Sequence, residues 1–240
     1  MRDKLTGVVL NTIKYNDKHS IVRIYTASRG ITAFLARQGH TPAARMRAAL
    51  LLPLSLVEFE ANIPAGRDLG TMHDLRRTHQ LSSIYADPYK NAITFFVSEL
   101  LLHTIQEQEA NQNLFNFIEQ SVLALEEAQR GIANFHLCFL YRLGALVGIQ
   151  PDAESYREGY WFDMAGGVFT PSRPLRHGLE PQKAQFLHLM SRMTFDNMHL
   201  FSLNRNQRNE ILDTILSYYH LHNSTLGTLK SPDILKQIFI

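Results

Sequence analysis

The apolar and polar positions of the chain follow two different periods, which meet near residue 80. In the first part, apolar residues alternate with polar ones or gather in short runs rich in β-branched and aromatic side chains, as strands do. Five such segments stand out, at residues 6–15, 20–26, 31–36, 53–60 and 70–77. Because no helical segment separates the first three, we expect an antiparallel meander that closes into a small barrel. A long loop is expected between the third and fourth strands.

From Asp87 onward the apolar period becomes helical. Asp87-Pro88 is typical of an N-cap followed by proline at the first helical position. Apolar residues then recur on one helix face, at Ile93, Phe96, Val97, Leu100, Leu101 and Ile105. Further helices are predicted from about residue 113, over residues 132–147 and 181–190, after a capping box at 204–207, and from Ser231-Pro232. The chain is therefore expected to fold as a small barrel followed by a helical domain.

The helical pattern lapses between residues 150 and 178, where several Pro and Gly residues occur. Tyr160-Trp161-Phe162 and Gly167-Val168-Phe169 could form two short strands within this loop-rich insert. Their aromatic rings fit either a small satellite core or a ligand site.

Charge is distributed unevenly. The 240 residues carry 24 Lys+Arg and 22 Asp+Glu, and 45% of them are apolar, which is typical of a globular chain. Residues 1–80 hold 12 basic and 6 acidic residues, whereas residues 81–240 hold 12 and 16. This pattern favours a basic module for a polyanion, joined to a partner or scaffold module. The alternative is ordinary variation of charge along a chain.

Catalytic motifs are absent from the sequence. There is no P-loop, nucleophile elbow, His-Glu-x-x-His helix or dinucleotide fingerprint, and the eleven histidines lack ligand spacing. The single cysteine, Cys138, excludes an internal disulfide framework and a cysteine-based zinc finger. The longest apolar stretch, residues 48–57, falls short of the roughly 20 residues that span a bilayer. We therefore expect a cytosolic protein that is no enzyme, binds no cofactor and does not enter membranes.

The basic barrel fits nucleic acid, which requires cations for phosphates and rings for bases. No acidic residue occurs between Gly30 and Glu58. The predicted phosphate contacts are Arg37, Arg45 and Arg47 in the loop after the third strand, with Lys14, Arg23 and Arg29 as lesser contributors. Three rings, those of Tyr15, Tyr25 and Phe34, either stack on bases or belong to the core, because alternation along a strand buries every other position.

The residues also resemble a known family, the bacterial RecO recombination mediators. Residues 6–10, 17–22, 25–30, 36–39 and 52–54 are similar to the opening of that family. Residues 135–144 look like its central helix, and residues 229–231, followed by Leu235 and Phe239, are similar to its C-terminal signature. The resemblance covers nearly the whole chain in the right order.

The resemblance implies an α+β protein of two domains. The first is a five-stranded OB-fold barrel at residues 1–80, and the second is an all-α helical domain at residues 81–240 with the irregular insert 150–178. Many members carry a four-cysteine zinc site in this insert, but this chain has no cysteine there. We therefore expect no metal, and a small apolar cluster in its place, made of Tyr160, Trp161, Phe162, Val168 and Phe169.

The resemblance also implies a function: binding of single- and double-stranded DNA, annealing of complementary strands, and a complex with RecR. It implies docking to the tail of single-stranded-DNA-binding protein, which helps to load the RecA recombinase. Alone, the chain is expected to be a monomer, in the cytoplasm and associated with the nucleoid. Two other interpretations are a protein-interaction adaptor whose basic barrel is incidental and an unrecognised nuclease.

An acidic tail that ends in an apolar residue requires an apolar pocket with a cation at its rim. The candidate cations are Arg142 on the predicted central helix and Lys230 before the last helix, with Phe139, Leu143 and Leu235 as possible walls. The alternative is that the two cations merely cap or solvate helix ends.

Overall fold

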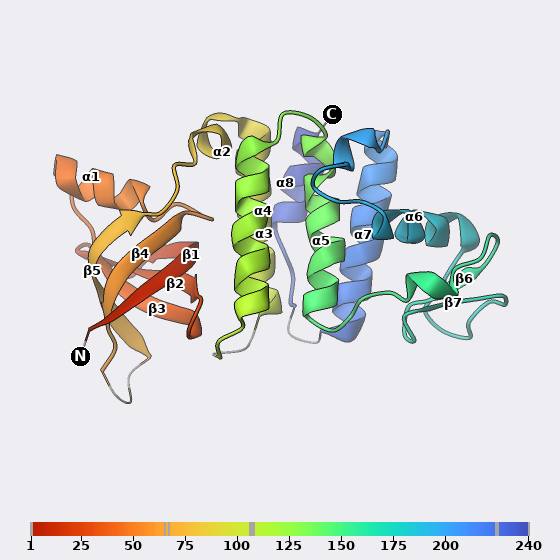
Figure 1. The fold of residues 1–240 in the computed structure, drawn as a ribbon, viewed down its shortest axis with the longest axis horizontal. Helices are drawn as coiled ribbons and strands as arrows, with labels where there is room; N and C mark the ends of the chain where they lie inside the picture. The colour runs from red at the N-terminus through yellow and green to blue at the C-terminus, as the bar shows by residue number, and fades with distance from the viewer. Residues whose placement is uncertain (1, 65, 67, 106–108, 224–225, 240) are drawn as a thin grey trace. The chain divides into compact units, whose positions relative to one another are not determined.

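The computed structural model describes residues 2–64, 66, 68–105, 109–223 and 226–239. The chain forms two compact units, residues 1–127 and residues 128–240. Their elements are labelled in Figure 1. The first unit thus combines the barrel with the helices that directly follow it, whereas a domain boundary at residues 80 and 81 stays a prediction.

Five strands form the barrel, and its closure confirms the predicted OB-fold (Figure 1). They are β1 (Asp3–Lys14), β2 (His19–Thr26), β3 (Gly30–Arg37), β4 (Leu56–Asn62) and β5 (Leu69–Arg77). Their order around the barrel is β1-β2-β3-β5-β4. The pair β3–β5 is parallel and the other pairs are antiparallel. Alternate residues point inward, so Val22, Ile24 and Phe34 are fully buried in the barrel core.

The connection between β3 and β4 is a helix, α1 (Pro42–Ala49), which corrects the expectation of a loop. The Thr41 side chain accepts a hydrogen bond from the Ala44 backbone N–H, so it caps the helix, and Pro42 stands in the first turn. Four alanines supply helix propensity. Only Ala44 of α1 is buried, which explains why the apolar pattern gave no sign of a helix.

Three further helices belong to the first unit: α2 (Ser82–Ala86), α3 (Pro88–Thr104) and α4 (Gln112–Glu127). Asp87 caps α3 as predicted, because its carboxylate accepts hydrogen bonds from the N–H groups of Tyr89 and Lys90. The predicted apolar face of α3 is buried. Its Ser98 hydroxyl donates to the Leu10 carbonyl of β1 at 2.9 Å. These helices therefore cover one side of the barrel.

The second unit contains the remaining elements. They are η1 (Ile132–Asn134), α5 (Phe135–Leu146), η2 (Ala153–Ser155), β6 (Trp161–Asp163), β7 (Val168–Thr170), β8 (Gly178–Leu179), α6 (Pro181–Ser191), η3 (Met198–Leu200), α7 (Arg205–His222) and α8 (Ser231–Ile238). Buried residues lie all round α5, as predicted for a central helix. The predicted capping box is present at the start of α7, between Asn204 and Gln207.

The insert forms a three-stranded sheet in the order β7-β6-β8. Its first two strands lie within one residue of the predicted ones, while β8 was not predicted. Phe162 and Phe169 are buried and their ring centroids lie 4.8 Å apart, so the aromatic cluster is a small core. Tyr160, Trp161 and Val168 lie half-buried beside it. Among the described helices of the chain, none is both long and apolar enough to cross a membrane.

Candidate nucleic-acid interface

Ion pairs neutralise part of the basic barrel. Lys14, a predicted DNA contact, lies 2.9 Å from Asp17, and Arg29, another, lies 2.7 Å from Asp3. Three more pairs join Arg2 to Glu60, Lys4 to Glu58 and Arg76 to Glu58. The hydrogen bond from Lys4 and the charge of Arg76 lower the pKa of Glu58, so its carboxylate is ionised at neutral pH. A cation that is already paired with a carboxylate binds a phosphate less strongly, because part of its charge is neutralised.

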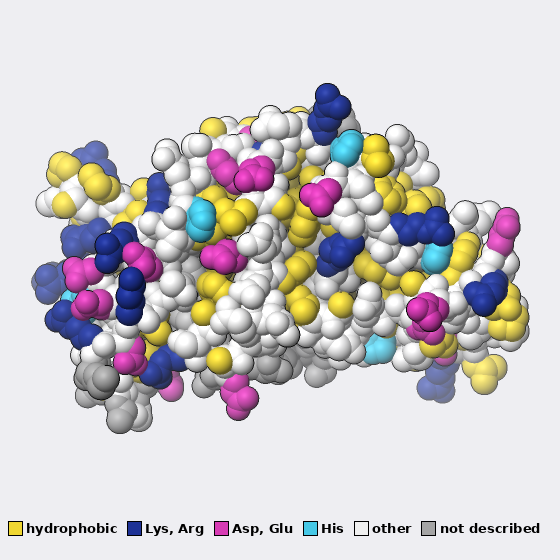
Figure 2. Space-filling model, in the orientation of Figure 1, with side chains coloured by type: hydrophobic (Ala, Val, Ile, Leu, Met, Phe, Trp, Pro, Cys, Tyr) yellow, Lys and Arg dark blue, Asp and Glu magenta, His cyan; other side chains and the backbone are white. Residues whose placement is uncertain are grey.

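Four barrel cations form neither an ion pair nor a side-chain hydrogen bond within the part of the chain that the structure describes: Lys18, Arg23, Arg37 and Arg47. All four side chains are exposed. Three of them were among the predicted contacts, and Lys18 was not in that set. Figure 2 shows the wider context, with Lys and Arg side chains over the barrel interspersed with acidic ones.

Two of these four cations lie near each other at one end of the barrel. Arg37 at the end of β3 pairs with His19 at the start of β2. The N–H of the next residue, Gln38, donates to the carbonyl of Lys18 at 2.8 Å. The β1–β2 hairpin and the segment that enters α1 are therefore neighbours.

Helix α1 extends this surface. The Arg45 guanidinium donates to the His40 carbonyl at 3.2 Å, and Arg77 of β5 donates to the Ala49 carbonyl at 2.6 Å. Met46, between Arg45 and Arg47 in the sequence, is 70% exposed. Figure 2 shows hydrophobic side chains beside basic ones at α1. We call the set Lys18, Arg37, Arg45, Arg47 and Arg77 the α1 surface.

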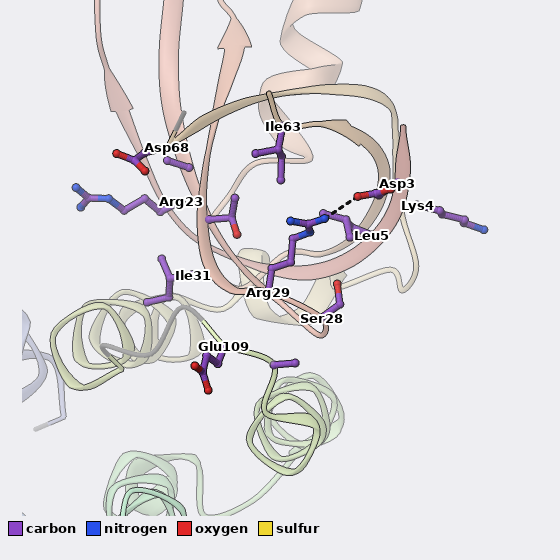
Figure 3. Close-up of a pocket in the computed structure, with 13 residues that line it drawn as sticks. Asp3, Lys4, Leu5, Arg23, Ser28, Arg29, Ile31, Ile63, Asp68 and Glu109 are labelled. Carbon is purple, nitrogen blue, oxygen red and sulfur yellow. Dashed lines mark hydrogen bonds and ion pairs between the residues drawn. The ribbon is translucent and has the colours of Figure 1, made fainter. Parts of the chain in front are cut away.

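The remaining predicted cations, Arg23 and Arg29, line a groove of about 910 Å³ on the first unit (Figure 3). Its other lining includes the apolar side chains of Leu5, Ile31 and Ile63 and the acids Asp3, Asp68 and Glu109. Figure 3 shows Arg29 reaching Asp3 while Arg23 extends on the side of Asp68. Carboxylates repel phosphates, but they accept hydrogen bonds from amino groups on base edges, and Arg donates to guanine. The groove therefore suits bases better than backbone.

The three candidate rings differ in their exposure to solvent. Tyr25 is buried and its ring stacks with that of Phe115, at 6.2 Å between centroids. Phe34 is buried against Phe59, at 4.9 Å. Tyr15, next to the α1 surface in the β1–β2 hairpin, is 64% exposed. Of the three, Tyr15 alone is therefore placed to stack on a base.

The predicted partner residues lie on two helices of the second unit. The Arg142 guanidinium of α5 donates twice to the Met193 carbonyl, at 2.6 and 2.9 Å, and is half-buried. Lys230 is exposed and directly precedes α8. The three proposed walls, Phe139, Leu143 and Leu235, are at most 2% exposed. They would line a pocket only if the packing around them opened, and the partner site stays a prediction.

The described residues bring together few side chains that could bind a metal ion. No three His, Cys, Asp or Glu side chains gather there. Cys138 is buried, and burial raises the pKa of its thiol to about 11. A thiol that resists ionisation is a poor metal ligand.

The acidic excess of residues 81–240 is confined to a short segment. Residues 81–127 hold seven acidic residues and one basic one, Lys90. Because this segment belongs to the first compact unit, the basic barrel and the acidic helices share one unit. Sequence reasoning missed this, and it also missed Glu109 as a lining residue of the groove.

Comparison with known proteins covers most of the chain. The family model "Recombination protein O N terminal" matches residues 1–80, and "Recombination protein O C terminal" matches residues 85–231. A DNA repair protein RecO from Phocaeicola vulgatus is 38% identical over 241 residues, which cover 100% of both chains. Proteins of the same name from Porphyromonas gingivalis and Flavobacterium psychrophilum are 34% and 30% identical, over 97% and 100% of both chains.

Proposed function

The chain belongs to the RecO family of DNA repair proteins, and from this premise we propose that it is a DNA-binding recombination mediator. It binds single- and double-stranded DNA, anneals complementary strands and, with RecR, helps to load RecA on DNA coated by single-stranded-DNA-binding protein. The observation that carries this proposal is the segment of residues 31–57, which has no acidic residue. In it the side chains of Arg37, Arg45 and Arg47 are exposed, together with that of Met46.

Phosphate contacts are assigned first to Arg37 and Arg47, because neither forms an ion pair with a carboxylate among the described residues. Arg45 follows, since its partner is a neutral backbone carbonyl. Each phosphate that is neutralised releases counterions, so binding weakens as salt rises. Lys14 and Arg29 contribute less because Asp17 and Asp3 already hold them.

The groove receives bases of a single strand. Its mixture of Arg23, aliphatic side chains and two carboxylates that form no ion pair among the described residues (Asp68 and Glu109) offers donors, acceptors and apolar contact together. The β2–β3 face of an OB-fold is where such barrels usually bind oligonucleotides. A duplex, whose bases are stacked and paired, would use the α1 surface alone.

Annealing by this protein requires no nucleotide hydrolysis. When cations neutralise phosphates on two strands, the repulsion between the strands falls, and base pairing then supplies the favourable free energy. We therefore propose a mediator that is not an enzyme, acts in the cytoplasm at the nucleoid, and is a monomer before it meets RecR. The tail of single-stranded-DNA-binding protein is proposed to dock on the second unit, near Arg142 or Lys230.

Salt-dependent binding of a labelled oligonucleotide tests the proposal. Two triple variants are compared: Arg37→Ala/Arg45→Ala/Arg47→Ala, and a control that loses the same charge from ion-paired residues, Lys4→Ala/Lys14→Ala/Arg76→Ala. For single-stranded DNA, loss of three phosphate contacts should flatten the plot of log affinity against log salt by about 2 units. The control should change it less.

Two results would contradict the proposal. If the wild-type protein shows no salt-dependent DNA binding, the barrel charge is incidental and the adaptor interpretation is favoured. If the two triple variants have equal slopes, the α1 surface is not the site. Metal-dependent cleavage of the oligonucleotide would instead indicate a nuclease.

A further inference from the structure

The loop between β7 and β8, residues 171–177, presents an unusual surface in the second unit. Leu175 has a relative exposure of 104%, the highest among the exposed large apolar side chains. Arg173, Arg176 and His177 are exposed on either side of it. A single exposed leucine is ordinary on a protein surface. A fully exposed leucine between two arginines at the tip of a loop is a less common arrangement.

The loop is held by its own contacts. The Arg173 guanidinium lies 5.5 Å from the centre of the Trp161 ring, on β6. The Thr170 hydroxyl donates to the Ser172 carbonyl at 2.9 Å, and the Met164 N–H donates to the His177 carbonyl at 3.1 Å. These contacts hold the two ends of the loop, and Leu175 lies exposed between them.

The base of the loop rests on the small aromatic core. Phe162 of β6 packs against Tyr218 of α7, at 5.6 Å between ring centroids. Tyr156 stacks on His188 of α6 at 4.0 Å between ring centroids. The Nε2–H of His222 donates to the Met164 carbonyl oxygen at 2.7 Å. The sheet that carries the loop is thus joined to two helices.

The charged residues in and around the loop are all basic. Residues 164–179 contain two arginines and no acidic residue. The flanking acids are engaged elsewhere: Asp163 accepts a hydrogen bond from the Ala165 N–H at 2.9 Å, and Glu180 lies 3.7 Å from Lys183. The Arg176 side chain has no ion pair or hydrogen bond within the described part of the chain, so its charge is available to an anion.

We propose that this loop is a second site for single-stranded DNA, in which Arg173 and Arg176 contact phosphates and Leu175 contacts unstacked bases. The inference rests on the proposed annealing function, because annealing requires that two strands be held at once. The barrel holds one strand, and the loop, which belongs to the other compact unit, receives the second.

The shape of the loop favours DNA over an acidic peptide. Peptides are usually bound in grooves or along a strand edge, whereas Leu175 stands out from the tip and encloses nothing. Proteins that bind nucleic acid often insert a single aliphatic side chain between bases, with Arg or Lys on the neighbouring phosphates. Binding should be independent of sequence, because the proposed contacts of the two arginines are phosphates and those of Leu175 are base faces, not base edges.

A strand-capture experiment with the full-length protein tests the inference. An oligonucleotide on beads is saturated with protein, and the beads are then offered a labelled oligonucleotide that is not complementary to the first. Wild-type protein should capture the second strand. Arg173→Glu/Arg176→Glu should reduce this capture about tenfold and slow annealing of complementary strands, while affinity for the first strand stays within about twofold.

The matched control is Arg130→Glu/Arg192→Glu, which makes the same charge change at two other exposed arginines of the second unit. It should capture the second strand like wild type. Two milder variants, Arg176→Glu and Leu175→Ser, change side chains that hold no part of the fold, and each should still lower capture. Far-ultraviolet circular dichroism monitors the folding of every variant, because Arg173→Glu itself changes the surroundings of Trp161.

The inference is overturned if wild type captures no second strand, or if the loop variants capture it as well as wild type does. It is also overturned if the control loses capture equally, since general charge would then explain the effect. Loss of capture of a labelled acidic peptide, with DNA capture unchanged, would assign the loop to a protein partner. Failure of first-strand binding in wild type would contradict the proposed function itself and is measured separately.

Discussion

The Glu126 carboxylate near the end of α4 caps the first turn of α2, where its Oε1 accepts a hydrogen bond from the Ser83 backbone N–H at 2.8 Å. Its Oε2 accepts from the Ile84 N–H at the same distance. The buried Lys90 of α3 completes the arrangement, because its Nζ donates to the Ser83 hydroxyl at 2.7 Å and to the Glu126 carbonyl at 2.8 Å. Three helices that follow the barrel are thereby joined by polar contacts.

Glu126→Ala should therefore destabilise the first unit by about 1–3 kcal/mol, because it leaves two backbone donors without their charged acceptor. Lys90→Met should cost less, since burial already lowers the pKa of Lys90 and its removal also relieves the desolvation of an ammonium group. Urea unfolding followed by far-ultraviolet circular dichroism measures both. Glu119→Ala on the same helix is the control. A Glu126→Ala midpoint equal to that of the control would contradict the capping role.

The ion pair between Asp3 and Arg29 predicts a gain of DNA binding. Asp3→Asn removes the carboxylate that lies 2.7 Å from the Arg29 guanidinium and frees a cation at the edge of the groove. The salt dependence of single-stranded DNA binding should steepen by up to about 0.7 units in the double-logarithmic plot. Stability should change little, because exposed pairs contribute about 0–1 kcal/mol.

Asp3→Asn/Arg29→Ala provides the control for that gain. It should return the slope to the wild-type value or below it, since the freed cation is absent. A steeper slope in the double variant would show that the effect comes from removal of negative charge in general. An unchanged slope in Asp3→Asn alone would exclude Arg29 from the DNA interface.

The strands and the long helices could be predicted from the sequence because each buries a regular set of side chains. The face of α3 and the capping box before Gln207 are examples, and both are confirmed. Helix α1 could not be predicted from its apolar pattern, because only Ala44 is buried and the evidence for it lies in Thr41, Pro42 and helix propensity. A helix that buries so little leaves no period to detect.

The candidate site could be predicted only in part. The sequence locates the cations, but it does not say which of them are neutralised. Asp3 and Arg29 are 26 residues apart, and Lys4 and Glu58 are further apart still. They meet because β1 pairs with both β2 and β4 and so brings the ends of distant strands together. The distinction between paired and unpaired cations is thus a product of the barrel, not of local sequence.

Zinc should be absent from the protein as purified without a tag. The single cysteine, Cys138, is buried on α5 with a raised thiol pKa, and Phe162 and Phe169 fill the insert. Elemental analysis should show well below one zinc per chain, and dialysis against a chelator should leave the unfolding midpoint of Trp161 fluorescence unchanged. Phe169→Ala, in contrast, should destabilise the second unit by about 3–5 kcal/mol. Stoichiometric zinc that resists dialysis would contradict this prediction.

The stability of the second unit should depend on pH through His136 of α5. Burial lowers the pKa of this imidazole to about 3, with the Arg208 charge as a second cause, and its ring stacks on Phe239 at 5.8 Å. In the unfolded chain the same group binds a proton near its ordinary pKa of 6.5. Between pH 6.5 and pH 3 the unfolded state therefore binds more protons than the folded state, and stability falls as pH falls.

The size of the effect follows from proton linkage. Between pH 7 and pH 5, His136 alone should remove about 2 kcal/mol from the free energy of unfolding. His136→Gln should abolish this part of the dependence, even if it lowers stability at pH 7. The half-buried His188, whose pKa is also lowered by burial, contributes in the same direction, so His188→Gln serves as the comparison. Urea unfolding at pH 7 and pH 5, followed by Trp161 fluorescence, gives both values. If the loss between the two pH values is the same in His136→Gln as in wild type, His136 is protonated in the folded protein and the assignment is wrong.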